Sequence, residues 1–342
     1  MSLLKRKERH EPPEVDDYYA ERPLPDEAPE PQPERAEPPL AEPGPTDLSK
    51  RDYVAVVRRA LKEFGNDHMT NIAAALAYYA FLAIPSALMV AVGVFGLVAG
   101  PNAVTTVIDK THGILPGQAS NLLEGSLKNM TQHQGTAISV LTIGGVLALW
   151  SLTGAMQNLM WAFNIAYDRD ERRGFVRRRI TALSMVVFAL IGFALAFGVL
   201  VLGPQLSTWI GDALGARTAV KIVWYVAEWP LLVLGLLVAF AGLMYYGPNV
   251  KHPRWRFLTF GSALAIVVWL VASAAFAFYV AKFGSYNKTW GSLAAVVVML
   301  TWLWLSSVAL LLGAEINAEA ERSRELRRGE PAERELQAPA KA

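Results

Sequence analysis

The sequence predicts an all-α membrane protein whose six transmembrane helices form one bundle with both termini in the cytoplasm. Three observations lead to this fold class. Hydrophobic residues make up 53% of the chain and the mean hydropathy is +0.27, which is more apolar than a soluble core of this length requires. Several uncharged runs exceed the roughly 18 residues that cross a hydrocarbon core about 30 Å thick. Lysine and arginine concentrate on alternate connections between these runs.

Residues 1–46 are expected to form a disordered, acidic, proline-rich tail. This segment holds eleven of the twenty prolines, and through Asp47 it has thirteen acidic residues against six basic ones. Such a composition buries too little apolar surface to offset the entropy of ordering. The tail is either a solvated tether or a docking segment for a protein partner, which the sequence does not identify.

Residues 47–66 are expected to form an interfacial amphipathic helix. Ser49 followed by Asp52 is a typical helix start, and 65–67, Gly-Asn-Asp, a typical end. One apolar stripe comprises Tyr53, Val57, Ala60, Leu61 and Phe64, and the basic residues lie largely off it.

Residues 67–318 are expected to form the membrane domain, followed by a charged cytoplasmic tail over 319–342. Pro85 and Pro230 lie inside the first and fourth spans, where a missing backbone donor predicts kinks. The expected spans are 72–99, 136–167, 180–203, 220–246, 257–281 and 291–314.

The orientation follows from the basic residues of the connections. Twenty lysines and arginines fall on the side that carries the two termini, and six fall on the other side. By the positive-inside rule both termini are expected in the cytoplasm.

Polar residues inside two spans form a candidate intramembrane site. Thr153, Gln157 and Asn164 share one helical face, which Asn158 borders. These groups either hold helices together or line a polar cavity. Glu228 lies about eight residues, or roughly 12 Å, into its span. It could bind a proton, a cation or a substrate headgroup, but it could equally reach outward to the interface or stay protonated.

An arginine-rich turn separates the second and third expected spans. The turn could serve only as a topology signal that contacts anionic lipid. Alternatively, it could bind a phosphorylated substrate or a lipid headgroup at the inner surface. Nucleic acid is not an expected partner, because Phe175 is the one aromatic residue in the turn. The candidate contacts for anionic groups are Arg172, Arg173, Arg177, Arg178 and Arg179.

The motifs of enzymes are missing from the sequence. There is no paired-histidine zinc signature, nucleophile elbow or P-loop, and no cysteine to supply a thiolate. His112 and His133 are twenty-one residues apart, which is no known metal spacing. We therefore expect a protein that is not an enzyme, without a metal or cofactor.

Four segments together resemble the YihY/BrkB family of bacterial inner-membrane proteins. They are 73–79 before the proline, the run from Leu149 to Asn164 into the arginine-rich turn, Tyr246-Gly-Pro-Asn249, and Leu312-Gly-Ala-Glu-Ile-Asn317. The resemblance covers about Asp47 to Arg322. It implies a six-helix inner-membrane bundle, in a family long labelled ribonuclease BN with some members linked to serum resistance or envelope lipid traffic.

Two functions remain open at this point. The first is transport or handling of a lipid or small anionic solute in envelope maintenance, with membrane lipids and their cytoplasmic anionic headgroups as partners. The second is a non-catalytic membrane scaffold or regulator that uses its tails. Ribonuclease activity is not expected, and a homo-oligomer is left open.

Overall fold

The computed structural model describes residues 32–40, 47–99, 134–251, 259–283, 292–333, 336–337 and 341. Its regular elements are all helical, which confirms the predicted all-α class. They are the 3-10 turn η1 (Pro33–Ala36) and the helices α1 (Lys50–Asn66), α2 (Met69–Ala99), α5 (Gln134–Ala166), α6 (Phe175–Ala213), α7 (Arg217–Tyr246), α8 (Phe260–Phe283) and α10 (Ser292–Arg328).

Each of the six expected spans falls on one long helix. In the described part of the chain, α2, α6, α7, α8 and α10 are long and apolar enough to cross a membrane. The helix α5 is not among these five, and its described side chains include Gln157, Asn158 and Asn164. Five candidate spans are therefore shown, and the count of six and the orientation of the termini stay predictions.

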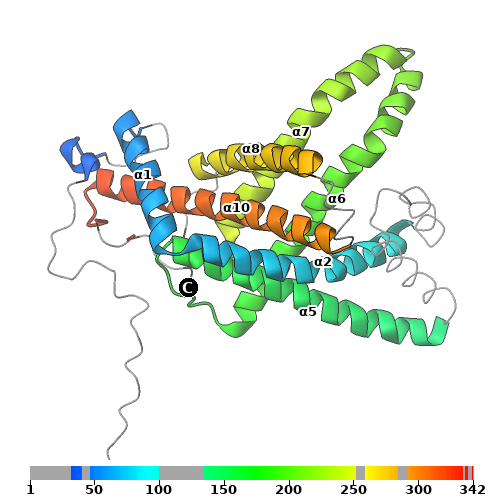
Figure 1. Ribbon diagram of the computed structural model, residues 1–342, viewed down its shortest axis with the longest axis horizontal. Helices are drawn as coiled ribbons and strands as arrows, with labels where there is room; N and C mark the ends of the chain where they lie inside the picture. Colours follow the sequence, from blue (N-terminus) through cyan, green and yellow to red (C-terminus); the bar gives the residue numbers. More distant parts are fainter. Residues whose placement is uncertain are drawn as a thin grey trace, which may run out of the picture.

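The long helices lie lengthwise, with one hairpin set apart from them. Figure 1 shows α2, α5, α8 and α10 extended along the molecule, while α6 and α7 form a hairpin whose far end stands away from the rest. Helix α10 packs against both α8 and α2, and α2 also packs against α5. Helix α10 is thus the central element of the bundle.

Small residues set the closest helix contacts. A Cβ atom on Gly313 would lie 2.6 Å from the side chains of Ala265 and Met244, and a side chain on Gly261 would meet the Gly313 carbonyl. Helices α8 and α10 therefore cross at a distance that only glycine allows, as is common where lipid supplies no hydrophobic drive for helix association.

The apolar side chains outside the core suit a lipid environment. The core gathers around Phe163, Met244 and Leu311, from α5, α7 and α10. Away from it, large apolar side chains such as Val223, Val271 and Phe278 are about two-thirds exposed. A surface of this kind is stable in a bilayer and not in water. The chain is a multi-pass membrane protein.

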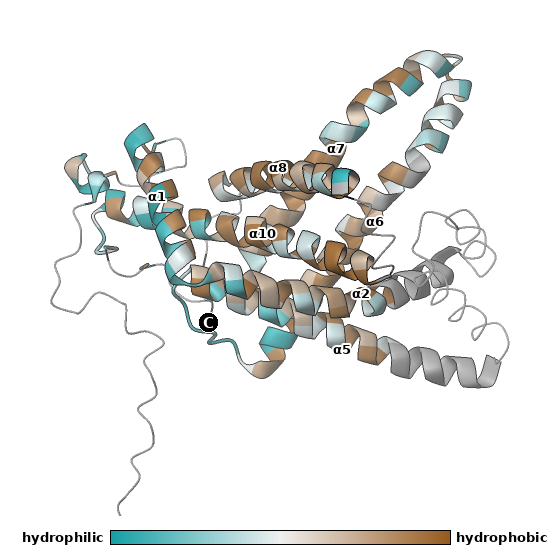
Figure 2. Ribbon diagram, viewed as in Figure 1, coloured by the Kyte–Doolittle hydropathy of each residue, from teal (hydrophilic) through white to brown (hydrophobic). Residues whose placement is uncertain are grey.

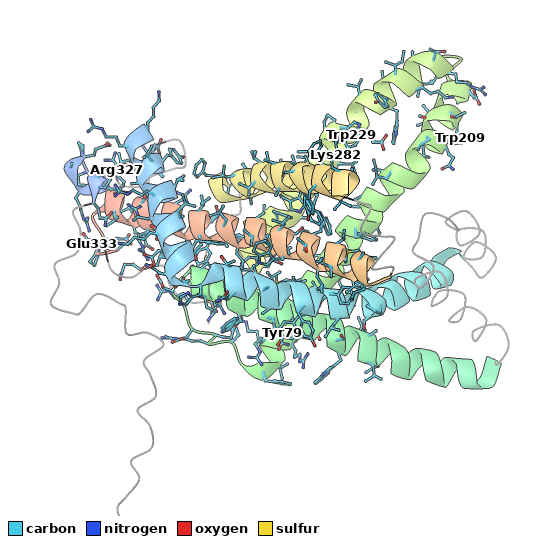
Figure 3. All side chains as sticks on the ribbon, viewed as in Figure 1. Tyr79, Trp209, Trp229, Lys282, Arg327 and Glu333 are labelled. Carbon is cyan, nitrogen blue, oxygen red and sulfur yellow. The ribbon has the colours of Figure 1, made fainter. Side chains whose placement is uncertain are left out.

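Charged side chains collect at one end of the bundle. Figure 2 shows the hydrophilic residues over η1, α1 and the last turns of α10, and Figure 3 labels Arg327 and Glu333 there. With 37 residues, α10 is roughly 55 Å long, so its last third extends beyond a hydrocarbon core of about 30 Å. We call this region the polar end; it comprises residues 32–40, α1, the 167–174 loop, Gly247 to Val250, Glu315 to Arg328, and the described residues after Arg328.

Helix α1 belongs to the polar end and crosses α10 (Figure 1). Its start is as predicted: Ser49 Oγ accepts from the Asp52 backbone N–H, and the Asp52 carboxylate accepts from the Ser49 N–H. The side chains that it buries are Asp52, Val56 and Ala60, and the last two pack on Ile316 and Ala320 of α10. Contact with the lipid interface stays a prediction, and Leu61 of the expected stripe is exposed.

Part of the expected disordered tail is ordered. Residues 33–36 form η1, and Glu34 is buried with its carboxylate bound by Arg59 and Ser323. Long-range ion pairing overrides the local composition here. Residues 1–31 and 41–46 of the tail, and His112 and His133, lie outside the described residues. Helices α2 and α7 continue through Pro85 and Pro230, and the kinks stay predictions.

Candidate anion-binding site

A buried hydrogen-bond cluster holds the arginine-rich loop against the α7 end of the bundle. Asn164 Oδ1 accepts from the Asn249 backbone N–H at 2.7 Å, and Asn164 Nδ2 donates to Glu171 at 3.1 Å. Arg173 binds Glu171 with Nε at 2.8 Å and Nη2 at 2.6 Å. The same Nη2 donates to the Gly247 carbonyl oxygen at 2.8 Å. The cluster fixes the position of Arg173.

The Glu171 carboxylate is held ionised by this cluster. Burial acts to raise its pKa, but hydrogen bonds from the Arg173 side chain and backbone, the charge of Arg173 and a bond from Asn164 act against it. The balance lowers the pKa of Glu171 below its ordinary value. Arg173 therefore has a permanent anionic partner on one side.

Arg173 also lines a pocket of about 250 Å³. The guanidinium is buried, and its Nη1 has no hydrogen-bond partner among the described residues. Arg177 and Lys341 bring two further cations to the same walls. The pocket is lined by Arg173, Arg177, Thr181, Tyr245, Tyr246 and Lys341.

Lys341 reaches this pocket from the far end of the sequence. Its Nζ donates to the carbonyl oxygens of Tyr245 at 2.9 Å and Pro248 at 3.1 Å, and lies 5.6 Å from the centre of the Tyr245 ring. Burial, followed by the charges of Arg173 and Arg177, lowers the pKa of Lys341 to about 8. Three cations thus converge, and a bound anion would relieve their mutual repulsion.

The remaining arginines of the turn have different surroundings. Arg179 lies 3.8 Å from the centre of the Trp150 ring, and its Nη1 donates to Thr153 Oγ1 at 2.9 Å. The structure thus joins two predicted residues from different groups, Arg179 of α6 and Thr153 of α5. Arg172 is exposed, Arg178 is half-buried, and neither lines the pocket.

The polar face expected on the second span is divided. Asn164 belongs to the cluster described above, whereas Asn158 Nδ2 donates to the Gly154 carbonyl of its own helix at 3.0 Å. Gln157 Nε2 is buried without a hydrogen-bond partner in the described part of the chain. These residues do not line the anion pocket.

Glu228 lies in a second, more open pocket of about 300 Å³ within the α6–α7 hairpin. The other residues that line it are Pro204, Ser207 and Thr208 of α6 and Lys221, Trp224 and Tyr225 of α7. None of them comes from α5, so the structure does not join Glu228 to Gln157 or Asn158. Helix α6 packs against both α7 and α5, but only its α7 side contributes to the pocket that Glu228 lines.

A network of buried ion pairs fastens the termini to α10. Arg59 of α1 donates to Glu319 at 2.6 Å, to Glu34 at 3.0 Å and to Ser323 at 2.6 Å. Arg322 binds Asp168 at 2.9 Å and Glu319 at 3.1 Å. The partners in this network are far apart in the sequence: Arg59 and Glu319 are separated by 260 residues, and Ser323 and Glu34 by 289.

The chain matches the model of the family "Virulence factor BrkB" over residues 60–337. The chain belongs to this family. The match confirms the resemblance seen in the sequence and covers both the arginine-rich loop and the glycine–proline–asparagine turn.

The relatives of the chain include proteins that are named as membrane proteins. The chain is 30% identical over 218 residues to "Putative ribonuclease-like protein YfkH" of Bacillus subtilis, covering 64% of this chain and 78% of that protein. It is 27% identical over 275 residues to "UPF0761 membrane protein RSc1559" of Ralstonia nicotianae, covering 77% of this chain and 58% of that protein. A UPF0761 membrane protein of Alkalilimnicola ehrlichii is 31% identical over 272 residues, which cover 74% of this chain and 55% of that protein.

The chain thus spans a little over half the length of these two UPF0761 relatives. No solved structure matches the chain.

Several residues of the site were missed as candidates from the sequence, among them Asn249 and Lys341. Asn249 belongs to a segment that carried the resemblance to the BrkB family, so that motif was the available signal. Lys341 had no comparable signal, because a single lysine near a charged end of the sequence is ordinary.

Proposed function

We propose that this BrkB-family protein binds an anionic group at the polar end and thereby handles a lipid or small anionic solute in envelope maintenance. The observation that carries the proposal is the buried Arg173 Nη1, which has no partner among the described residues and belongs to a side chain on the pocket wall. A phosphate or carboxylate oxygen is the natural acceptor for a guanidinium N–H.

The geometry of the pocket favours a compact anion. Glu171 and the Gly247 carbonyl hold one edge of the Arg173 guanidinium, so the remaining nitrogen is positioned in advance. Arg177 and Lys341 add positive charge, while Tyr245 and Tyr246 supply apolar walls. Phosphate-bearing headgroups and small phosphorylated solutes share this chemistry.

The position of the pocket suits lipid. The basic residues that the positive-inside rule predicts to be cytoplasmic include those of the polar end. The cytoplasmic leaflet is rich in anionic lipid. Arg179, which lies over Trp150 near the start of α6, adds a further cation beside the pocket helix.

The test uses the full-length protein in lipid nanodiscs made of phosphatidylethanolamine with a minor fraction of phosphatidylglycerol. Native mass spectrometry measures how many phosphatidylglycerol molecules remain bound. Arg177→Gln and Lys341→Gln are expected to weaken retention by about tenfold each, because a charge-assisted hydrogen bond contributes about 1.5–3 kcal/mol. Arg172→Gln, an exposed neighbour that does not line the pocket, is the matched control.

A second measurement, the melting temperature with and without inorganic phosphate, distinguishes a free anion from a lipid. If inorganic phosphate raises the melting temperature and the effect is lost in Arg177→Gln, the pocket takes a free anion rather than lipid. Equal retention and equal melting shifts in all four proteins would contradict the proposal.

We propose further that the protein acts without catalysis. The word "ribonuclease-like" belongs to the name of the Bacillus relative. Within the described residues no three histidine, aspartate or glutamate side chains are grouped to hold a metal ion. Purified protein, freed of soluble nucleases, is expected to leave RNA intact with Mg²⁺ or Mn²⁺ present; cleavage that follows the protein through purification would argue against this.

A further inference from the structure

Glu315 is a buried acid that the anion pocket does not use. It lies in the Leu312–Asn317 segment of α10, just after the residues expected to cross the membrane. The residue is 1% exposed, and its Oε1 has no hydrogen-bond partner among the described residues. A buried carboxyl oxygen without a partner requires an explanation.

The charged groups that act electrostatically on Glu315 are acidic. Four carboxylates act on it: Glu63 from α1, Asp67 from the α1–α2 turn, Asp168 from the loop after α5, and Glu319 one turn further along α10. The phenol of the buried Tyr167 also interacts electrostatically with Glu315. No cation in this set compensates a negative charge on Glu315.

The cations of this region are engaged with other carboxylates. Arg322 gives Nη2 to Asp168 and Nη1 to Glu319. Arg59 gives Nε to Glu319 and Nη2 to Glu34. In the part of the chain that the structure describes, neither arginine forms an ion pair with Glu315.

Binding a proton removes the negative charge of Glu315 and with it the repulsion from the neighbouring carboxylates. An ionised carboxylate that is buried, unpaired and surrounded by like charges is strongly disfavoured, whereas the neutral acid is tolerated. The neighbouring Glu63 shows the same tendency: burial raises its pKa, Asp168 and Glu319 add to the effect, and Arg322 opposes it.

We propose that Glu315 is a proton-binding site of the polar end. It holds a proton while the α1–α2 turn and the 167–174 loop pack on α10, and it gives that proton to the adjoining solution when this packing opens. A metal cation is the less favoured occupant, because the described residues contain no group of three acidic or histidine side chains placed to hold one.

Proton occupancy has a structural consequence for the loop. Asp168 faces Glu315, and Glu171 and Arg173 follow it in the same loop. A negative charge on Glu315 would repel Asp168 and Asp67, so deprotonation is expected to loosen the loop. The backbone N–H of Arg169, which donates to the Asn164 carbonyl at 2.9 Å, is a suitable reporter of that loosening.

The direct test is infrared spectroscopy of the full-length protein in nanodiscs. At neutral pH the wild type is expected to show the carbonyl band of a protonated carboxylic acid, and Glu315→Gln is expected to lose it. Glu171→Gln and Glu63→Gln are the controls and should keep the band. A band that survives in Glu315→Gln, or that disappears in Glu63→Gln instead, overturns the assignment.

Hydrogen exchange and melting temperature give an independent readout. Glutamine mimics the neutral acid, so Glu315→Gln is expected to fold with a melting temperature at least equal to that of the wild type. On raising the pH, exchange at Arg169 should accelerate more in the wild type than in Glu315→Gln. Failure of Glu315→Gln to fold, identical exchange in the two proteins, or a sodium-dependent rise in melting temperature confined to the wild type would each overturn the proposal.

Discussion

Removing Arg59 should release the N-terminal segment from the bundle. The Arg59 side chain is 15% exposed and its partners Glu34 and Glu319 are 0% and 2% exposed, so Arg59→Ala leaves two buried carboxylates without their shared cation. Loss of one partner of a buried ion pair typically costs about 3–5 kcal/mol. At about 1.4 kcal/mol per factor of ten, the equilibrium for local opening rises by roughly 100-fold or more.

Hydrogen exchange measures that opening at one amide. The Leu40 backbone N–H donates to the Arg327 carbonyl oxygen at 2.8 Å, so it is protected only while residues 32–40 remain docked on α10. Arg59→Ala is expected to abolish this protection while the amides of α2 and α8 keep theirs. The adjacent Arg58 is exposed, and Arg58→Ala is the matched control. Unchanged protection of Leu40 in Arg59→Ala would refute the view that buried ion pairs hold the segment.

Three further predictions concern packing and pH. Gly261→Val should lower the melting temperature in detergent, because overpacking of a close helix crossing costs about 1–3 kcal/mol; Gly235→Ala, where a Cβ meets nothing within 4 Å, should not lower it. Asn164→Leu removes one hydrogen bond from the buried Asn249 N–H and one from the Glu171 carboxylate. The free energy of unfolding should fall by about 1–3 kcal/mol. An unchanged denaturation midpoint would contradict a stabilising role for the cluster. Because the folded protein lowers the pKa of Glu171, the stability that Glu171 contributes is present above its ordinary pKa of 4.5 and is lost as the pH falls through the folded value. Melting temperatures recorded against pH should therefore fall less steeply on acidification in Glu171→Gln than in the wild type.

The sequence alone determined the helices, because the forces that form them are local. The Ser49–Asp52 capping box starts α1 as expected, and each predicted span falls on one helix of the structure. Long apolar runs must satisfy their own backbone hydrogen bonds in lipid, so their composition and length are sufficient evidence. Asn164 and Arg173 were also visible in advance as polar groups in or beside a basic turn.

The tertiary structure alone decided which polar groups meet. Glu34 and Lys341 come from segments that resemble solvated tails, yet one is buried on Arg59 and the other lines the pocket of Arg173. Glu228 and Gln157 were predicted to share one intramembrane site, but Glu228 lines a pocket of the α6–α7 hairpin that has no α5 residue among its lining. A charged side chain carries no local signal for its partner, since the free energy that buries it comes from an opposite charge that can lie hundreds of residues away.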